Sequence, residues 1–198
     1  MKTAFILCGA LGREAQDIVR KHQWEVDLIG ISALHHLLPE RITPDVESRL
    51  RALRAQYARV IVVYGECGTG GALDDLLARY GIERVAGAHC YAMFAGPLFE
   101  TLLAEEPGTF FLTDFLARAF HSTVIKGLGL DRYPELKEDY FRHYRRVVYL
   151  AQRDDPLLRA KAQAAADYLG LPLVVQFTGY SLLEDRLIAL MHTPQEAL

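Results

Sequence analysis

The sequence predicts an α/β protein with a three-layer, Rossmann-like arrangement around one mostly parallel sheet of about six or seven strands. Apolar runs of strand length alternate with helical patterns along nearly the whole chain, which is typical of βαβ units. No repeat, low-complexity stretch or linker interrupts the 198 residues. We therefore expect a single α/β domain over residues 1–198.

The elements follow from the spacing of apolar residues and from the glycines and cap residues between them. Val60–Tyr64 is the clearest strand, because a β-branched run is bounded by Arg59 and Gly65. Gly96 and Pro97 interrupt the helical pattern of Tyr91–Ala104, so this stretch is expected as one helix or two pieces. The other expected strands are Thr3–Leu7, Val26–Ile31, Ile82–Ala86, Thr109–Leu112, Arg146–Ala151 and Leu173–Phe177. The other expected helices are Gly12–His22, Pro44–Tyr57, Gly71–Tyr80, Thr113–Lys126, Pro134–Tyr144, Pro156–Leu169 and Ser181–Met191.

Composition narrows the class of protein. Hydrophobic residues make up 51% of the chain and charged residues 24%, as in ordinary globular proteins. A net charge of -3 without long charged runs favours neither nucleic acid nor an anionic membrane as a partner. The first residues read as a strand and not as a signal peptide, so a cytoplasmic location is expected.

The three cysteines share one kind of position. Cys8, Cys67 and Cys90 each follow a strand-like run, at the point where it gives way to a glycine-bearing loop. If those runs are parallel strands of one sheet, the three thiols emerge along the same edge, where α/β proteins bind ligands. An odd number of cysteines also excludes a complete set of disulfides within the chain.

Three thiols with one open position suit a metal centre that binds substrate. Thiolates are ligands of soft or borderline metals, and zinc held by three protein ligands is a common catalytic form. A [4Fe-4S] cluster with one open iron uses the same residues. The spacings contain neither C-x-x-C nor H-E-x-x-H, and small buried hydrophobes are the structural explanation of the same cysteines.

The loops around the cysteines supply further candidates. Gly9, Gly65 and Gly68 would let the backbone turn tightly and approach a cofactor. Glu66 and His89, each next to a cysteine, are candidate general bases or proton carriers. Glu14 is an alternative fourth ligand, against the simpler role of an acid at the positive end of a helix.

Two other patterns have competing explanations. The loop Gly65–Gly71 opens a helix, which suits a phosphate, but it lacks the Gly-Lys-Ser/Thr ending of a P-loop. Thr113 and Asp114 follow the strand Thr109–Leu112 and are placed to hydrogen-bond a cofactor, whereas helix capping is the simpler role.

Several segments together resemble a known family. Cys8-Gly9-Ala10-Leu11, Tyr64-Gly65-Glu66-Cys67-Gly68, Gly87-Ala88-His89-Cys90-Tyr91 and Phe111-Leu112-Thr113 are similar to the prokaryotic family DUF1638, a domain of unknown function. Members of that family tend to be encoded near corrinoid-dependent methyltransferases and their activating proteins. The resemblance implies a role in methyl-group or one-carbon metabolism, with the cysteines matching those of the family.

These observations lead to one expected function and its rivals. We expect a zinc-binding protein that acts on a small molecule through Cys8, Cys67 and Cys90, as a metal-dependent methyltransferase or lyase. The alternatives are a [4Fe-4S] enzyme and a non-catalytic accessory protein that delivers metal to, or holds, a corrinoid protein. A nucleotide-binding domain with buried cysteines is a further alternative.

Overall fold

The computed structural model describes residues 2–193, which divide into two compact units. The first unit combines the chain up to Met93 with the segment from Ser181 onward, and the second is Phe94–Tyr180. Each unit carries its own three-stranded parallel sheet. The α/β class, the parallel pairing and a total of six strands agree with the sequence-based prediction. The single continuous sheet was wrong. That the chain forms one domain stays a prediction.

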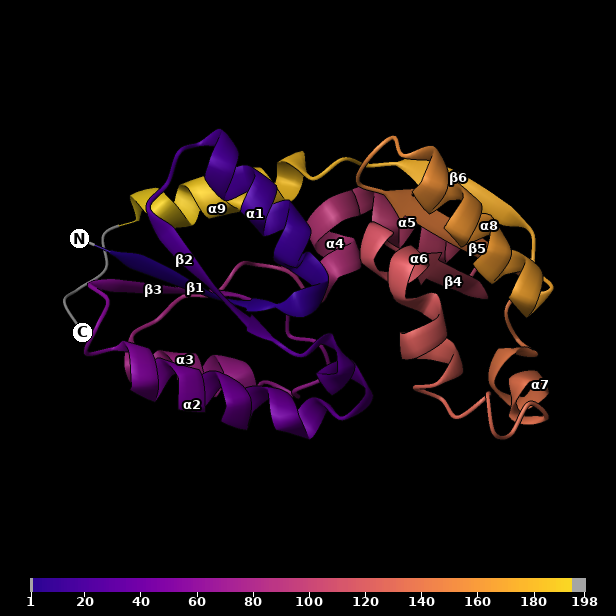
Figure 1. Cartoon of the computed structure of the whole chain (residues 1–198), viewed down its shortest axis with the longest axis horizontal. Helices are drawn as coiled ribbons and strands as arrows, with labels where there is room; N and C mark the ends of the chain where they lie inside the picture. The colour runs from indigo at the N-terminus through magenta and orange to yellow at the C-terminus, as the bar shows by residue number, and fades with distance from the viewer. Residues whose placement is uncertain (1, 194–198) are drawn as a thin grey trace. The chain divides into compact units, whose positions relative to one another are not determined.

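The sheet of the first unit has the order β2-β1-β3. Its strands are β1 (Thr3–Cys8), β2 (Val26–Ile31) and β3 (Arg59–Val63). β1 lies in the centre and is buried along its whole length, as expected of a parallel strand covered on both faces. Figure 1 shows α1 (Gly12–Lys21) and α9 (Ser181–His192) on one side of this sheet, and α2 (Ile42–Leu53) and α3 (Ala72–Tyr80) on the other.

Short helical segments complete the first unit. The three-residue η1 (Gly9–Leu11) leads from β1 into α1, and η2 (Ala33–Leu37) and η3 (Pro39–Arg41) lead from β2 into α2. The expected strand Ile82–Ala86 is reduced to a single parallel bridge between Val62 and Arg84. A single bridge does not amount to a further strand of this sheet.

The second unit has the sheet order β4-β5-β6, with strands β4 (Thr109–Leu112), β5 (Arg146–Ala151) and β6 (Leu173–Phe177). Its core lies between this sheet and the helices α6 (Asp114–Phe120) and α8 (Pro156–Leu169). The side chain of Asp155 caps α8 by accepting from the amide nitrogens of Leu157 and Leu158, at 2.8 and 3.4 Å. Gly170, with φ of 73°, ends the helix as the sequence predicts.

The connections of the second unit are more irregular than expected. The stretch after residue 90 forms α4 (Cys90–Ala95) and α5 (Pro97–Glu105), separated by Gly96 with φ of 54°. α6 passes into a π-helical turn, η4 (His121–Ile125), and α7 (Leu136–Phe141) precedes β5.

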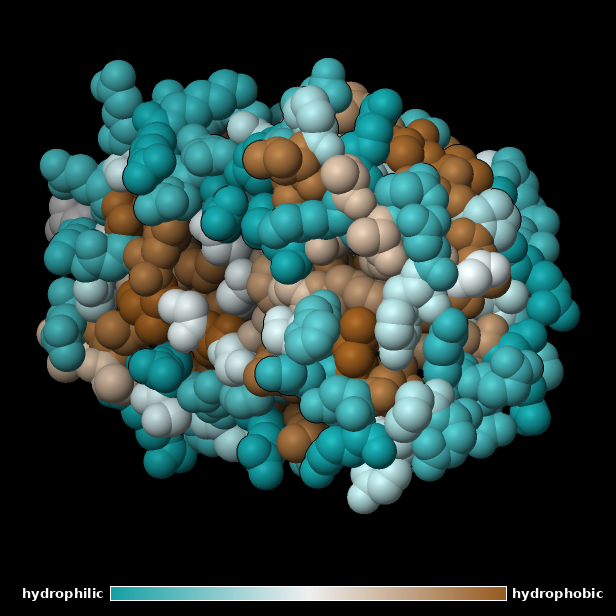
Figure 2. All heavy atoms as spheres, turned by 45° about the vertical axis from the view of Figure 1, so that its right-hand side comes forward, coloured by the Kyte–Doolittle hydropathy of each residue, from teal (hydrophilic) through white to brown (hydrophobic). Residues whose placement is uncertain are grey.

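Hydrophilic residues cover most of the face drawn in Figure 2, with hydrophobic residues in smaller groups among them. Within residues 2–193, no helix has the length and apolar character needed to span a membrane.

Candidate functional site

Cys8 lies at the carboxyl end of β1, beside the end of β3. The register pairs Leu7 with Val63, so Cys8 and Tyr64 follow on adjacent parallel strands. The thiol is buried, and its sulfur accepts a hydrogen bond from the amide nitrogen of Ala10 at 3.4 Å. Burial raises the pKa of the Cys8 thiol, while the amides of Ala10 and Leu11 and the hydroxyl of Tyr64 favour its thiolate.

The Tyr64 hydroxyl is a buried polar group whose hydrogen-bonding capacity is not used in a normal way. The side chain is completely buried, and its oxygen has no hydrogen-bond partner of normal geometry among the described residues. Burial and the neighbouring Cys8 raise the pKa of the phenol. The ring of His36 stacks on it, with ring centres 5.9 Å apart. A buried hydroxyl without a partner is costly, and such groups are concentrated where a protein binds something.

The glycine-rich loop after β3 is organised by the carboxylate of Glu66. This carboxylate accepts from the amide nitrogens of Gly68 and Gly71, at 2.8 and 3.1 Å, and from the hydroxyl of Thr69 at 2.8 Å. Thr69, followed by the loop amides, lowers the pKa of Glu66 to about 2. The donors that a phosphate would need are thus occupied by an acid of the chain itself. At neutral pH such a carboxylate holds the loop and is a weak proton acceptor.

Cys67 lies where this loop contacts the segment before α4. Its backbone has φ of 51°, an unusual conformation for a residue with a side chain, and its amide nitrogen donates to the carbonyl of Ala88 at 2.8 Å. A Cβ on Gly65 would lie only 2.9 Å from each of three atoms: the Cys67 sulfur, the Ala88 oxygen and the His89 Cα. The two loops are therefore in close contact, which explains the glycine at 65 and puts the Cys67 sulfur against the backbone beside Cys90.

Cys90 begins α4 and completes the set of thiols. Burial, and after it the charges of Cys8 and Cys67, raise the pKa of the Cys90 thiol. Burial and Cys8 likewise raise the pKa of Cys67 to about 12. Burial is the largest cause of the raised pKa at each of the three thiols, so all three are protonated near neutral pH.

His89 has a local role at the start of the same helix. Its Nδ1 accepts from the amide nitrogen of Ala92 at 3.3 Å, and its ring leans against Tyr91 with ring centres 5.3 Å apart. Accepting through Nδ1 leaves the proton of the neutral ring on Nε2.

The expected three-cysteine metal centre is not assembled. The described residues include no group of three or more Cys, His, Asp or Glu side chains placed to hold a metal ion. The three cysteines are free thiols, and they do not come together as a ligand set among the described residues. The Cys8 sulfur accepts from the amide of Ala10, whereas the Cys67 sulfur lies beside the Cα hydrogens of Gly65, where a Cβ would be only 2.9 Å away.

The remaining predicted residues divide between the two units. A Cβ on Gly9 would lie 3.0 Å from the carbonyl oxygen of Ile31, so β2 leaves room only for glycine there. Gly68 has φ of 83°. Thr113 belongs to the second unit, where its hydroxyl caps α6 by accepting from the amide of Leu116 at 3.3 Å. Helix capping therefore explains Thr113.

Sequence reasoning missed or misjudged three residues. Tyr64 was counted only as the end of a strand, although a tyrosine closing an apolar run next to Gly65 was a usable signal. Glu14 is in the first turn of α1, as its helix-end role requires, but its near-complete burial was not expected. Arg84 was treated as part of a strand, yet its charge favours the thiolate of Cys67.

The comparisons with known proteins agree with the resemblance. The model of the family described as "Protein of unknown function (DUF1638)" matches residues 31–187. This match includes Cys67 and Cys90 and begins after Cys8. Neither the curated proteins nor the solved structures contain a match to the chain. Because the matched region covers most of the sequence, the chain belongs to the DUF1638 family.

Proposed function

We propose that the carboxyl edge of the first sheet binds a thiophilic metal ion through Cys8, Cys67 and Cys90, with zinc favoured. The observation that carries this proposal is the set of donors around Cys8. The amides of Ala10 and Leu11 and the hydroxyl of Tyr64 all favour its thiolate, although burial opposes it. Donors gathered around a buried sulfur are useful chiefly when that sulfur is ionised.

A bound cation would offset the cost of ionising the buried thiols. A buried thiolate is costly without a positive charge nearby, and one divalent ion would offset that cost for three thiols whose pKa is raised chiefly by burial. The Tyr64 hydroxyl then gains an acceptor, because a thiolate accepts hydrogen bonds far better than a thiol. Donors of this kind outside the ligand set are a general feature of metal centres.

Binding requires the thiols to converge. The loop from Gly65 to Gly71 is suited to this, since Gly68, Gly70 and Gly71 have positive φ and Cys67 holds a conformation that costs about 1 kcal/mol or more. Release of that backbone strain would favour movement of the Cys67 sulfur. Glu66 holds the shape of the loop, while His89, at the start of α4, is the proposed proton carrier.

A zinc ion with three thiolate ligands keeps one position for a small substrate, such as a thiol, and lowers its pKa. On this proposal the chain is a metal-dependent transferase or lyase. The connection with corrinoid proteins stays a prediction from the resemblance.

Metal analysis of anaerobically purified protein tests the proposal. We expect about one equivalent of zinc in the wild type, falling below about a tenth in Cys8→Ser, Cys67→Ser and Cys90→Ser. A broad absorption band near the blue edge of the visible would identify the iron–sulfur alternative instead. Less than about a tenth of an equivalent of any transition metal in the wild type, with three reactive thiols, would contradict metal binding.

A further inference from the structure

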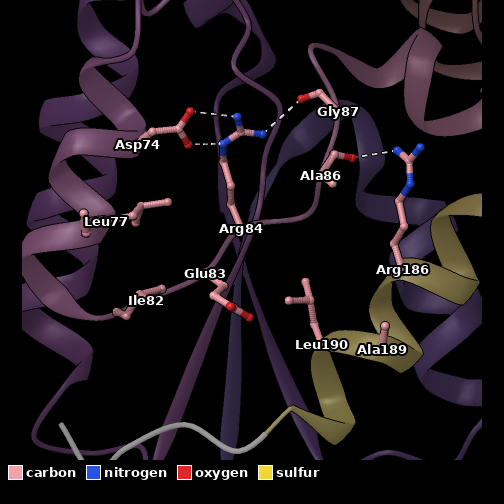
Figure 3. A pocket seen from close by; sticks show the side chains of 11 residues that line it. Asp74, Leu77, Ile82, Glu83, Arg84, Ala86, Gly87, Arg186, Ala189 and Leu190 are labelled. Carbon is pink, nitrogen blue, oxygen red and sulfur yellow. Dashed lines mark hydrogen bonds and ion pairs between the residues drawn. The ribbon is translucent and has the colours of Figure 1, made fainter.

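A cavity of the first unit lies beside the segment 82–87, which precedes α4. Its volume is about 640 Å³, within the range of small-molecule sites. It is bounded by α3, by the segment 82–87 and by α9 (Figure 3). The charged side chains that line it are those of Asp74, Glu83, Arg84 and Arg186.

The two arginines at the Gly87 end of this cavity, Arg84 and Arg186, differ in their hydrogen-bond and ion-pair partners. Arg84 is fully engaged: it forms a two-point ion pair with Asp74, at 2.5 and 2.9 Å, and donates to the carbonyls of Val85 and Gly87. Arg186 donates to the carbonyl of Ala86 at 2.6 Å and has no acidic partner among the described residues. Its guanidinium therefore keeps donors for an anion.

The backbone of the segment 82–87 offers the N–H of Arg84 as one more donor. The same segment is not suited to pair with an added β-strand. Val62 exchanges hydrogen bonds with Glu83 and Val85, so the N–H and C=O of Arg84 point away from β3. Arg186 covers the next available carbonyl, that of Ala86, which stops a further strand from pairing along this edge. The cavity is thus suited to a small molecule and not to an added strand.

Apart from the two arginines and Asp74, the cavity is lined by apolar side chains and by the carboxylate of Glu83. Leu77 of α3 and Ile82 line the cavity on one side of the segment 82–87, and Leu190 of α9 lines it on the other (Figure 3). The carboxylate of Glu83 points away from the two guanidinium groups (Figure 3). A ligand in this cavity therefore has one anionic group and an apolar body.

We propose that this cavity binds a small organic carboxylate, with the carboxylate on Arg186 and the apolar body against Leu77, Ile82 and Leu190. Hexanoate is the probe, hexylamine carries the same body with the opposite charge, and acetate carries the same charge without the body. Titration of the chelator-treated full chain, followed by amide NMR, reports binding at residue resolution. We expect shifts centred on Ala86 and Gly87, and at least about tenfold tighter binding of hexanoate than of either comparator.

Two variants test the assignment separately. Arg186→Gln removes the charge and is expected to weaken hexanoate binding about tenfold or more, whereas Ala189→Phe fills the cavity and abolishes binding without removing a charge. Arg49→Gln, on α2 and paired with Asp45, is the matched control and binds as the wild type does. Equal binding of hexylamine, no binding of hexanoate, or shifts that survive both variants would overturn the proposal. Because the protein is metal-free throughout, failure of the proposed metal site does not affect these outcomes.

Discussion

The thiol of Cys8 and the hydroxyl of Tyr64 lie side by side at the carboxyl ends of the central strand β1 and its neighbour β3. Both groups are buried, and each changes the pKa of the other. No hydrogen bond of normal geometry satisfies the hydroxyl among the described residues. The metal-free protein therefore bears a cost there that a thiolate would remove.

Substitution Tyr64→Phe removes the hydroxyl. It therefore separates the effect of that group on the stability of the metal-free protein from its effect on zinc affinity. Without metal, we expect the variant to be as stable as the wild type or about 1 kcal/mol more stable, because a buried hydroxyl without a partner is lost. Zinc affinity should fall about tenfold or more, because a donor to the Cys8 thiolate is lost. Chemical denaturation and competition with a zinc chelator measure the two effects. A less stable variant with unchanged affinity would show that the hydroxyl serves the fold alone.

Glu66 makes the stability of the glycine-rich loop depend on acidity. Its pKa falls to about 2 in the folded protein, against about 4.3 in an unfolded chain. The stabilisation is therefore complete above about pH 4.5 and is lost as the pH falls through about 2. Because Glu66 is only partly buried, Glu66→Gln is expected to cost only about 1 kcal/mol at neutral pH.

Denaturation curves between neutral pH and about pH 2 check this expectation. The difference in stability between the wild type and Glu66→Gln should shrink as the pH falls. A difference that is constant across this range would mean that the charge of Glu66 does not hold the loop.

Gly65 is required by contact between two loops. In Gly65→Ala the new Cβ would lie 2.9 Å from the backbone of both Ala88 and His89, so one loop must shift, at an expected cost of about 2 kcal/mol. Gly30→Ala is the control, because nothing lies within 4 Å of its Cβ position and a small gain of stability is expected. Thermal unfolding of the pair measures the contrast. Equal effects of the two substitutions would contradict close packing of the loops.

Asp114 is the buried charge that joins the strand ends of the second unit. It accepts from the hydroxyl of Tyr149 at 2.7 Å and from the amide of Gln152 at 3.0 Å, and Arg153 lies 3.4 Å away. Asp114→Asn places a donor among these donors, so a loss of about 2 to 3 kcal/mol is expected. Asp155→Asn keeps the cap of α8 and should be nearly neutral. Comparable losses in a urea denaturation series would argue against a special role for Asp114.

Local patterns were sufficient for the elements themselves. The apolar run at Thr3–Leu7, the β-branched run at Val60–Tyr64, the Asp155 cap and the stop at Gly170 agree with the structure. Each depends on residues within a few positions of one another, where backbone preference and side-chain alternation decide. Pairing does not depend on such neighbours, and so Ile82–Ala86 has the composition of a strand but forms only one bridge.

By itself, the sequence determined that parallel strands alternate with helices, and that each cysteine enters a loop near a strand end or helix start. The tertiary structure alone decided that the strands form two sheets, that Glu66 fills its own glycine-rich loop and that Tyr64 is buried beside Cys8. It also decided that the Cys8 sulfur accepts from the amide of Ala10, whereas the Cys67 sulfur lies beside Gly65. The reason is physical: helix and strand preferences act between near neighbours, whereas sheet partners, burial and side-chain direction depend on residues distant in the chain.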